Sequence, residues 1–459
     1  MGALLVLPAP IALLVAYIGS AVPPSSGALG RGADVETPAA AFDAAYAHGI
    51  AKGLAALGPR TPGSPAHARA RALILGELGG AAMPPAREAA HVGPDGESVY
   101  NIFADRPGAS SMPPILVGAH YDTVAGSPGA SDDAAGVGIV LGLARAFGRH
   151  PGARPMIFSV WDGEETGLKG STADAHQRAR GGRLPSAVLA IDLCGWRDGA
   201  TVLHTFRDGL WGARPLAPSG LVGVMLGVAT ALDVPLAVGD PIISPVYQTL
   251  TRLVRIPFDA DDAAYARLGI PALFVSDSSF TRFAPAYHTP RDTAEILSEE
   301  MIGRTGRLLA GTLAALDAGA SPEGPTTWVA LGRWCLQGRT LLIVAILSGL
   351  PLAGALIRRR GGAALLAGAY TAAAVLEPAA TLLWLAPGVW LAPLAGARAP
   401  VSMRWASGAL ALVMPLACAA VFVAASLRFG WHPPRIGLPA TIVHGAAALM
   451  LVRFVWLRR

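Results

Sequence analysis

Short apolar runs alternate with longer helical segments through the middle of this chain. Four of the runs have the length and residue types of buried strands: 113–119, 154–162, 187–193 and 271–276. Helical spacing of apolar residues occupies the segments between them, as at 134–150 and 170–180. Parallel strands need helical crossovers and are buried on both faces. The order therefore predicts an α/β fold, with a mostly parallel (mixed) sheet covered by helices on both faces.

Further elements extend this domain on either side of the runs. Residues 41–80 have the pattern of two helices separated by the turn-forming "GPRTPGSP". Residues 98–108 alternate in polarity like a strand, and a further helix is predicted within 293–317. We therefore expect one globular domain over residues 30–325.

Polar side chains follow the predicted strands at the points where these strands end. They are His120 and Asp122, Glu164 and Glu165, and Asp192, and His288 lies in a loop after the last of these strands. Ligands of open α/β sheets bind at the carboxyl ends of the strands, which meet at one edge of the sheet. We therefore expect these imidazole and carboxylate groups to lie close together.

Imidazole nitrogens and carboxylate oxygens without thiolates suit Zn²⁺ or a similar divalent ion. The carboxylates in these loops would repel one another strongly, and a bound cation is the simplest compensation; they are Asp132, Asp133, Glu164, Glu165 and Asp192. Two ions about 3.5–4 Å apart could share one carboxylate, and a carboxylate bound to neither ion could act as a general base.

Each fragment has an ordinary interpretation when it is taken alone. "HYD" could be a hydrogen-bonded loop pair, "SDDAAG" an N-cap before the helix at 134–150, and "DGEETG" a solvated loop. "YHTPRDT" could be a turn. Their joint occurrence, in order and at strand ends, favours a metal site over these alternatives.

Six motifs together resemble the M28 family of co-catalytic zinc aminopeptidases, whose fold is of the zinc-exopeptidase type. They are "GPRTPGS" (58–64), "GAHYDTV" (118–124), "SDDAAGVG" (131–138), "DGEETGLKGS" (162–171), "IDLCG" (191–195) and "AYHTPRDT" (286–293). The motifs span most of residues 40–315. The resemblance implies two Zn²⁺ ions, although another divalent ion would suit the same donors.

The resemblance also implies a role for each matching residue. One zinc would be held by His120, Asp132 and Asp192, and the second by Asp132, Glu165 and His288, so that Asp132 bridges both. The implied catalytic residues are Glu164 as general base, Asp122 as the partner that orients His120, and Tyr287 as a stabiliser of the tetrahedral intermediate. Asp133 is assigned to an outer position or to capping of the next helix.

The implied reaction is hydrolysis of the first peptide bond of a substrate with a free N-terminus. A metal-bound hydroxide would attack the carbonyl carbon, and Glu164 would pass the proton to the leaving amine. Family members that are glutaminyl cyclases lack the "DDxxG" pattern, so "SDDAAG" argues against that activity. A non-catalytic M28-like binding or scaffold module is the alternative, and the filled ligand positions count against it.

One segment departs from the resemblance. Many relatives carry a histidine after the aspartate within the region that corresponds to 258–274, where this chain has Asp262 and Ala263. We expect this segment to shape the substrate pocket, so the side-chain preference does not follow from the family.

The ends of the chain are far more apolar than the middle. Apolar residues make up 53% of the chain and charged residues 15%, and residues 3–22 carry no charge over a length that can cross a bilayer. Further apolar blocks follow residue 333: 340–357, 362–396, 407–427 and 438–456. We expect an N-terminal transmembrane signal anchor at 1–24, a metallopeptidase domain at 30–325, and a C-terminal all-α transmembrane domain of four to five helices at 336–459.

Arginines predict the orientation of this integral membrane protein in the lipid bilayer. If the block at 362–396 crosses twice, giving six spans, the arginines at 358–360, 398, 404, 453, 458 and 459 share one side. That side is expected to be cytoplasmic, so the catalytic domain lies on the non-cytoplasmic side, which is periplasmic or extracellular in a bacterium. A single crossing gives five spans and weakens the asymmetry. Only 358–360 forms a dense basic run, so a nucleic-acid partner is not expected.

Overall fold

The computed structural model describes most of the region between residues 32 and 331. The described residues are 29, 32–80, 86–92, 97–148, 152–205, 215–242, 244, 247–248, 251, 259–279, 281–282, 284–331, 334–337, 342–343, 345 and 370–371. The predicted anchor at 1–24 and nearly all of the predicted membrane domain at 336–459 lie outside these residues. Among the described residues, no helix combines the length and the apolar character needed to cross a membrane.

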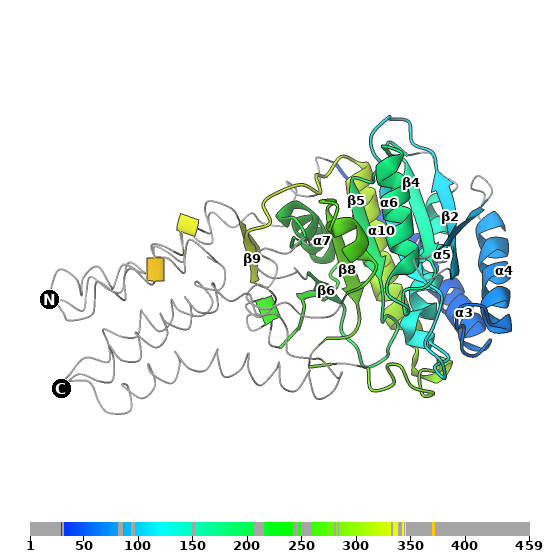
Figure 1. The fold of residues 1–459 in the computed structure, drawn as a ribbon. Coiled ribbons are helices and arrows are strands. Elements are labelled where there is room, and N and C mark those ends of the chain that lie inside the picture. Colours follow the sequence, from blue (N-terminus) through cyan, green and yellow to red (C-terminus); the bar gives the residue numbers. More distant parts are fainter. Residues whose placement is uncertain are drawn as a thin grey trace, which may run out of the picture.

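Eight strands form one mixed sheet in the order β1-β2-β4-β3-β5-β8-β6-β7 (Figure 1). The centre, β4-β3-β5-β8, is parallel, whereas β1, β2 and β6 each pair antiparallel with a neighbour. The strands are β1 (Arg87–Val92), β2 (Ser98–Arg106), β3 (Ile115–His120), β4 (Met156–Trp161), β5 (Ala187–Ile191), β6 (Val202–His204), β7 (Ala237–Val238) and β8 (Ala272–Ser276). The mixed α/β sheet predicted from the sequence is confirmed.

Helices cover both faces of this sheet. On one face α5 (Ala135–Gly148) packs on β3 and β4, and it is covered in turn by the helices α3 (Ala44–Ala55), α4 (Pro65–Gly80) and α10 (Glu299–Asp317). α7 (Ser219–Ala231) packs against α10, and α2 (Glu36–Ala40) does so as well. The other face carries α6 (Lys169–Arg180) and α9 (Asp262–Ala266), which contact each other.

Successive residues of the central strands feed the two cores. Val117 of β3 belongs to the core under α5, whereas its neighbour Leu116 belongs to the core under α6 and α9. This is the period-two alternation of a strand buried on both faces. Close helix packing on the α5 side depends on a glycine, because a Cβ on Gly138 would lie 2.3 Å from the carbonyl oxygen of Ala47 in α3.

The sequence predicted the central elements and missed several peripheral ones. The strands β2, β3, β4, β5 and β8 and the helices α3, α4, α5, α6 and α10 all lie at or within the predicted ranges. β1, β6, β7, α7 and α9 were not expected. β6 has three residues and α9 has five, so neither is long enough to show a period.

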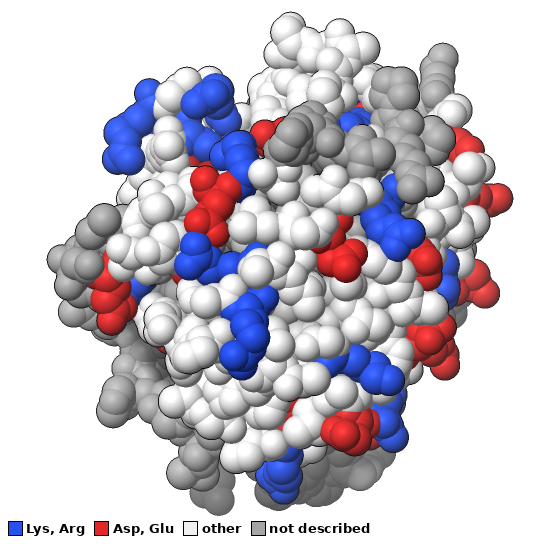
Figure 2. All heavy atoms as spheres, turned by 90° about the vertical axis from the view of Figure 1, so that its right-hand side faces the viewer, with Lys and Arg blue, Asp and Glu red and all other residues white. Residues whose placement is uncertain are grey.

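Basic and acidic side chains are interspersed on the face of the molecule shown in Figure 2. Ion pairs at least partly exposed to solvent include Arg71–Glu88 at 2.7 Å and Arg87–Asp105 at 3.2 Å. On the face of Figure 2, this pattern is typical of a solvated surface rather than of a surface that binds a polyanion.

A hairpin follows the last helix of the domain. β9 (Trp328–Leu331) pairs antiparallel with β10 (Trp334–Gln337), and β10 contacts α7. The Trp328 side chain is fully buried and donates from Nε1 to the carbonyl oxygen of Ala217 at 2.8 Å. Gln248 donates to and accepts from the backbone of Ala330, at 2.7 and 2.8 Å. The segment after α10 is therefore part of the folded domain as far as this hairpin.

Replacing Trp328 with alanine is expected to lower the free energy of unfolding of the domain by about 3–5 kcal/mol, because it leaves a cavity the size of an indole ring and an unpaired carbonyl. Chemical denaturation of the full-length chain in detergent, followed by tryptophan fluorescence, would measure this change. Met112→Ala is the matched control, since Met112 is 46% exposed and its loss is expected to cost under about 0.5 kcal/mol. Equal effects of both substitutions would contradict the anchoring role of Trp328.

Candidate metal centre

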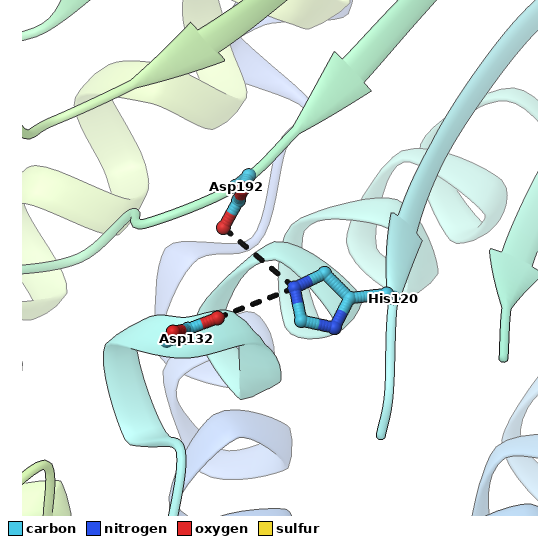
Figure 3. Close-up of side chains that lie close together, drawn as sticks. All are labelled: His120, Asp132 and Asp192. Carbon is cyan, nitrogen blue, oxygen red and sulfur yellow. Dashed lines mark ion pairs between the residues drawn. The ribbon is translucent and has the colours of Figure 1, made fainter. Parts of the chain in front are cut away.

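Three chain segments bring His120, Asp132 and Asp192 together at the carboxyl ends of the parallel strands. His120 is the last residue of β3, Asp192 follows β5, and Asp132 lies in the helical turn η1 (Ala130–Ala134) that leads into α5. Nε2 of His120 lies 3.3 Å from Oδ1 of Asp132 and 3.7 Å from Oδ1 of Asp192 (Figure 3). All three residues are buried, and their ligand atoms lie within 4.8 Å of one another.

Asp132 also belongs to a second group of potential ligands. Its Oδ2 lies 3.3 Å from Nε2 of His288, and the same nitrogen lies 2.9 Å from Oε2 of Glu165. One oxygen of Asp132 therefore faces each group. All five residues predicted to bind metal lie in these two groups, which share Asp132.

The donor atoms of both groups fit a bound divalent cation. Within the described residues, four buried ligand atoms have no hydrogen-bond partner: Nε2 of His120, Oδ2 of Asp132, Glu165 Oε1 and Asp192 Oδ1. Buried polar atoms without partners are costly, and buried carboxylates are normally paired or bound to metal. Two imidazoles and three carboxylates without a thiolate form a donor set that zinc accepts. The residues present therefore fit the ions that the resemblance implies.

The Asp122 carboxylate is the acceptor for the loop that carries both glutamates. Its Oδ1 accepts the backbone N–H of Glu164 and its Oδ2 that of Glu165, each at 3.1 Å. Nδ1 of His120 lies 3.2 Å from the Asp122 backbone carbonyl and 3.5 Å from its carboxylate. The backbone carbonyl is thus the nearer partner of the His120 ring, and the Asp122 side chain mainly positions Glu164 and Glu165.

Asp292 holds the segment that contains Asp132. Its two carboxylate oxygens accept the backbone N–H groups of Ser131 at 2.8 Å and of Asp132 at 3.2 Å. Ser131 Oγ in turn donates to the carbonyl of Cys194, close to Asp192. Asp292 lies in the motif "AYHTPRDT", but no pattern in the sequence connects it with a loop 160 residues away.

Residues 101–313 match the family model described as Peptidase family M28, and all five potential ligands lie inside the match. These residues form an M28 peptidase domain. The identification made from the six motifs is confirmed.

The M28 domain is similar to several curated proteins. Leucine aminopeptidase 1 of Uncinocarpus reesii is 28% identical over 221 residues, which cover 43% of this chain and 50% of that protein. Endoplasmic reticulum metallopeptidase 1 of Mus musculus is 30% identical over 206 residues, which cover 44% of this chain and 20% of that protein. The chain spans about half the length of the leucine aminopeptidases that it matches, or less of other relatives.

Solved structures share the fold of the M28 domain. The Legionella pneumophila LapA aminopeptidase superposes with a TM-score of 0.52 at 19% identity, covering 62% of this chain and 75% of that one. LapB from the same organism gives a TM-score of 0.53 at 19% identity, covering 63% and 76%. At this level of identity the similarity concerns the fold alone.

Glu164 of the M28 domain lies in an acidic environment. Burial raises the pKa of its carboxyl well above the usual value, and the neighbouring carboxylates of Asp192 and Asp261 raise it further, while His120 opposes this. Asp261 is itself buried, its Oδ1 has no hydrogen-bond partner among the described residues, and burial raises its pKa to about 7. The sequence had singled out the segment around Asp261 only for the missing histidine.

Two further residues of the M28 domain lie beside the ligands. The rings of Tyr287 and His288 stack with their centroids 3.7 Å apart. Burial raises the pKa of Tyr287, with Asp132 and Asp192 adding to the shift, so its hydroxyl stays protonated. Oδ1 of Asp133 accepts the N–H of Gly136 at 2.9 Å, so Asp133 caps α5.

Zinc affinity of the M28 domain is expected to rise with pH between about pH 6 and 9 because the ligand histidines must lose protons. Burial would lower the pKa of His288, but the carboxylates of Asp132 and Glu165 outweigh it and raise the value to about 10. In the same way Asp122 and Asp132 raise the pKa of His120 well above its usual value, against the effect of burial. Both imidazoles are thus protonated at neutral pH without a cation, and protons compete with zinc more strongly as the pH falls.

Calorimetric zinc titrations in buffers of different ionisation enthalpy would count the protons released. We expect a net release of protons when zinc binds, so the apparent zinc affinity should be greater at higher pH. An affinity that stays constant over this range would contradict the protonated state of these histidines.

Proposed function

We propose that this protein is a di-zinc aminopeptidase. The single observation that supports it most is that two complete ligand triads share one carboxylate, Asp132, with each oxygen directed to a different triad. One ion would be held by His120, Asp132 and Asp192, and the other by Asp132, Glu165 and His288. Two ions bound in this way lower the pKa of a water molecule and polarise a peptide carbonyl.

Glu164 is the general base of the proposed reaction. Its carboxyl group lies beside Asp192 and His120 but belongs to neither triad. It takes a proton from the attacking water as the new C–O bond forms, and delivers it to the amine nitrogen as the C–N bond breaks. Asp122 positions Glu164 for this transfer by accepting its backbone N–H. The protonated hydroxyl of Tyr287 is a donor for the oxygen that becomes negatively charged.

The proposed substrate is a peptide with a free N-terminus. A protonated α-amine is a cation, and the acidic groups around the site, which include Asp192, Glu165 and Asp261, attract it. An anchored amine places only the first peptide bond at the ions, so residues leave from the end of the substrate. Relatives named aminopeptidases, in Uncinocarpus reesii and Bacillus subtilis, support this assignment.

We also propose that the protein is anchored in a membrane, with the M28 domain on the non-cytoplasmic side. The support comes from the sequence: uncharged residues 3–22 and the apolar blocks after residue 333, with arginines concentrated on one predicted side. The similarity to endoplasmic reticulum metallopeptidase 1 of Mus musculus agrees with a membrane location.

Zinc content and exopeptidase activity of the full-length chain in detergent would test the function together. We expect two zinc ions per chain, and release of coumarin from aminoacyl-coumarins but not from their N-acetylated forms. Equal cleavage of both forms would contradict the anchored amine. Zinc binding without any turnover would favour the alternative, a non-catalytic M28-like binding module.

A further inference from the structure

The motif "GPRTPGS" at residues 58–64 has no role in the proposed reaction, yet its arginine lies beside the metal centre. Arg60 follows α3 and is fully buried. The carboxylates of Asp122, Asp292 and Asp132 stabilise its charge electrostatically. Burying a guanidinium costs free energy unless its N–H donors find acceptors. The acceptors of Arg60 therefore show which parts of the chain it connects.

All but one of the side-chain hydrogen bonds of Arg60 are donated to the segment between the proposed ligands His120 and Asp132. Nε donates to the carbonyl of Tyr121 at 2.8 Å, Nη2 to that of Gly129 at 2.9 Å, and Nη1 to that of Pro128. The exception is a bond from Nη1 to Leu54 at 3.3 Å, at the end of α3. Tyr121 is the residue after His120, and Gly129 lies three residues before Asp132. The planar guanidinium thus joins the start of the 121–129 loop to its end.

The backbone of Arg60 adds a further connection to the same loop. Its N–H donates to Oγ1 of Thr123 at 2.8 Å. At the other end of the loop Gly129 has a positive φ of 60°, and a Cβ there would lie 2.3 Å from the Asp132 carbonyl oxygen and 3.0 Å from Nη2 of Arg60. The loop is therefore packed directly around the guanidinium, with no room for a side chain at this glycine.

We propose that Arg60 is a positioning residue for the metal centre: by joining Tyr121 to Gly129 it sets the separation of the ligands His120 and Asp132. The inference rests on the proposed function, since it concerns the site that would hold zinc. None of the hydrogen bonds of Arg60 goes to a proposed ligand side chain. It acts through the backbone carbonyls of the loop.

The charge of Arg60 supports this role. Burial lowers the pKa of Arg60 to about 10, and the nearby carboxylates of Asp122 and Asp292 counteract the shift, so the side chain is a cation at neutral pH. A fixed cation reduces the repulsion among the acidic groups before zinc binds. Lysine would keep the charge, but its single nitrogen cannot span carbonyls at both ends of the loop.

Arg60→Lys is the test, with Arg106→Lys as a matched control. Arg106 is also a buried guanidinium, 4% exposed, that donates to a backbone carbonyl, that of Arg154, at 2.7 Å. It ends β2 and pairs with Met156 at the start of β4, at the opposite edge of the sheet from the metal centre. Both substitutions replace a buried guanidinium with an ammonium group, but only Arg60 donates to the 121–129 loop.

The measurement is the zinc dissociation constant of the full-length chain in detergent, from competition with a chromophoric chelator after metal removal. We expect Arg60→Lys to weaken zinc binding about 10–100-fold, the range for groups that orient metal ligands. Arg106→Lys should leave the affinity within about twofold of the wild type, because it changes no group near the ligands. Thermal unfolding monitors the structural cost of each substitution separately.

Zinc affinity of folded Arg60→Lys equal to that of the wild type would overturn the inference, as would an equal loss in Arg106→Lys. If Arg60→Lys does not fold, Arg60→Gln is the second variant, because its shorter amide can donate to one end of the loop only: weaker zinc binding is expected, and unchanged binding overturns the inference. A wild-type chain that binds zinc but hydrolyses no peptide would overturn the proposed function and leave this role of Arg60 intact.

Discussion

Asp132→Asn is expected to remove zinc from both positions and with it nearly all peptidase activity. Oδ1 of Asp132 faces His120 and Oδ2 faces His288, so this one side chain would supply a ligand atom to each proposed ion. Asparagine has one acceptor oxygen and an NH₂ group that cannot bind a cation, and it also removes one negative charge. Zinc affinity should fall by more than about 100-fold, beyond the range for outer partners of metal ligands.

Metal analysis of the purified variant and kcat/KM on an aminoacyl-coumarin measure the two effects of Asp132→Asn. Asp198→Asn is the control, since Asp198 is an exposed aspartate only six residues after the ligand Asp192. It should keep two ions and full activity. Two tightly bound ions in Asp132→Asn would show that Asp132 does not bridge the triads.

Glu164→Gln is expected to lower kcat by about 10²–10⁴-fold while zinc content and the unfolding midpoint stay close to the wild type. Glutamine preserves the size of the side chain and the backbone N–H that Asp122 accepts, but it cannot take a proton. The groups that shift the pKa of Glu164 in the absence of cations include His120, Asp192 and Glu165, so its carboxyl lies near residues of both triads. Steady-state kinetics should show the loss in kcat rather than in KM.

Glu165→Gln distinguishes the proposed metal-binding role of Glu165 from the proposed role of Glu164 as general base. Glu165 lies 2.9 Å from His288 in the second triad, so its substitution should lower zinc occupancy as well as turnover. Glu295→Gln, at an exposed position that belongs to neither triad, should change neither. Full activity in Glu164→Gln would mean that another group is the base, and the buried Asp261 would then be the first candidate.

The sequence predicted that His120, Glu165 and Asp192 lie at one edge of the sheet, because each of them follows a strand with a strong local signal. Apolar runs such as "ILVGA" and "MIFSVW" identify parallel strands, and the topology of such sheets brings their carboxyl ends together whatever the details of packing. His120, Glu165 and Asp192 could therefore be placed at one edge before any coordinates. The pairing of Asp132 with both histidines came from the family resemblance alone.

The supporting residues could not be predicted in the same way. Asp292 accepts backbone N–H groups of Ser131 and Asp132, and Arg60 donates to the carbonyls of Tyr121 and Gly129. These partners are backbone atoms, which every residue has, so no residue type in the sequence reveals the pairing. The same applies to Asp122: its carboxylate accepts backbone N–H groups of the loop that carries Glu164 and Glu165, while the His120 ring lies nearer to the Asp122 backbone carbonyl.

The docked hairpin determines how far the M28 domain can move from whatever follows it in the chain. The stretch from residue 318 to residue 337, if extended, would give the domain a tether of roughly 70 Å. Ala320, Pro322 and Pro325 instead bond to the ends of α10 and α7, and Trp328 is buried in the domain. Most of this stretch is therefore bound to the domain and cannot extend as a tether. If the chain is anchored in a membrane as proposed, lengthening it after residue 337 would therefore extend the reach of the site more than lengthening it between α10 and the hairpin.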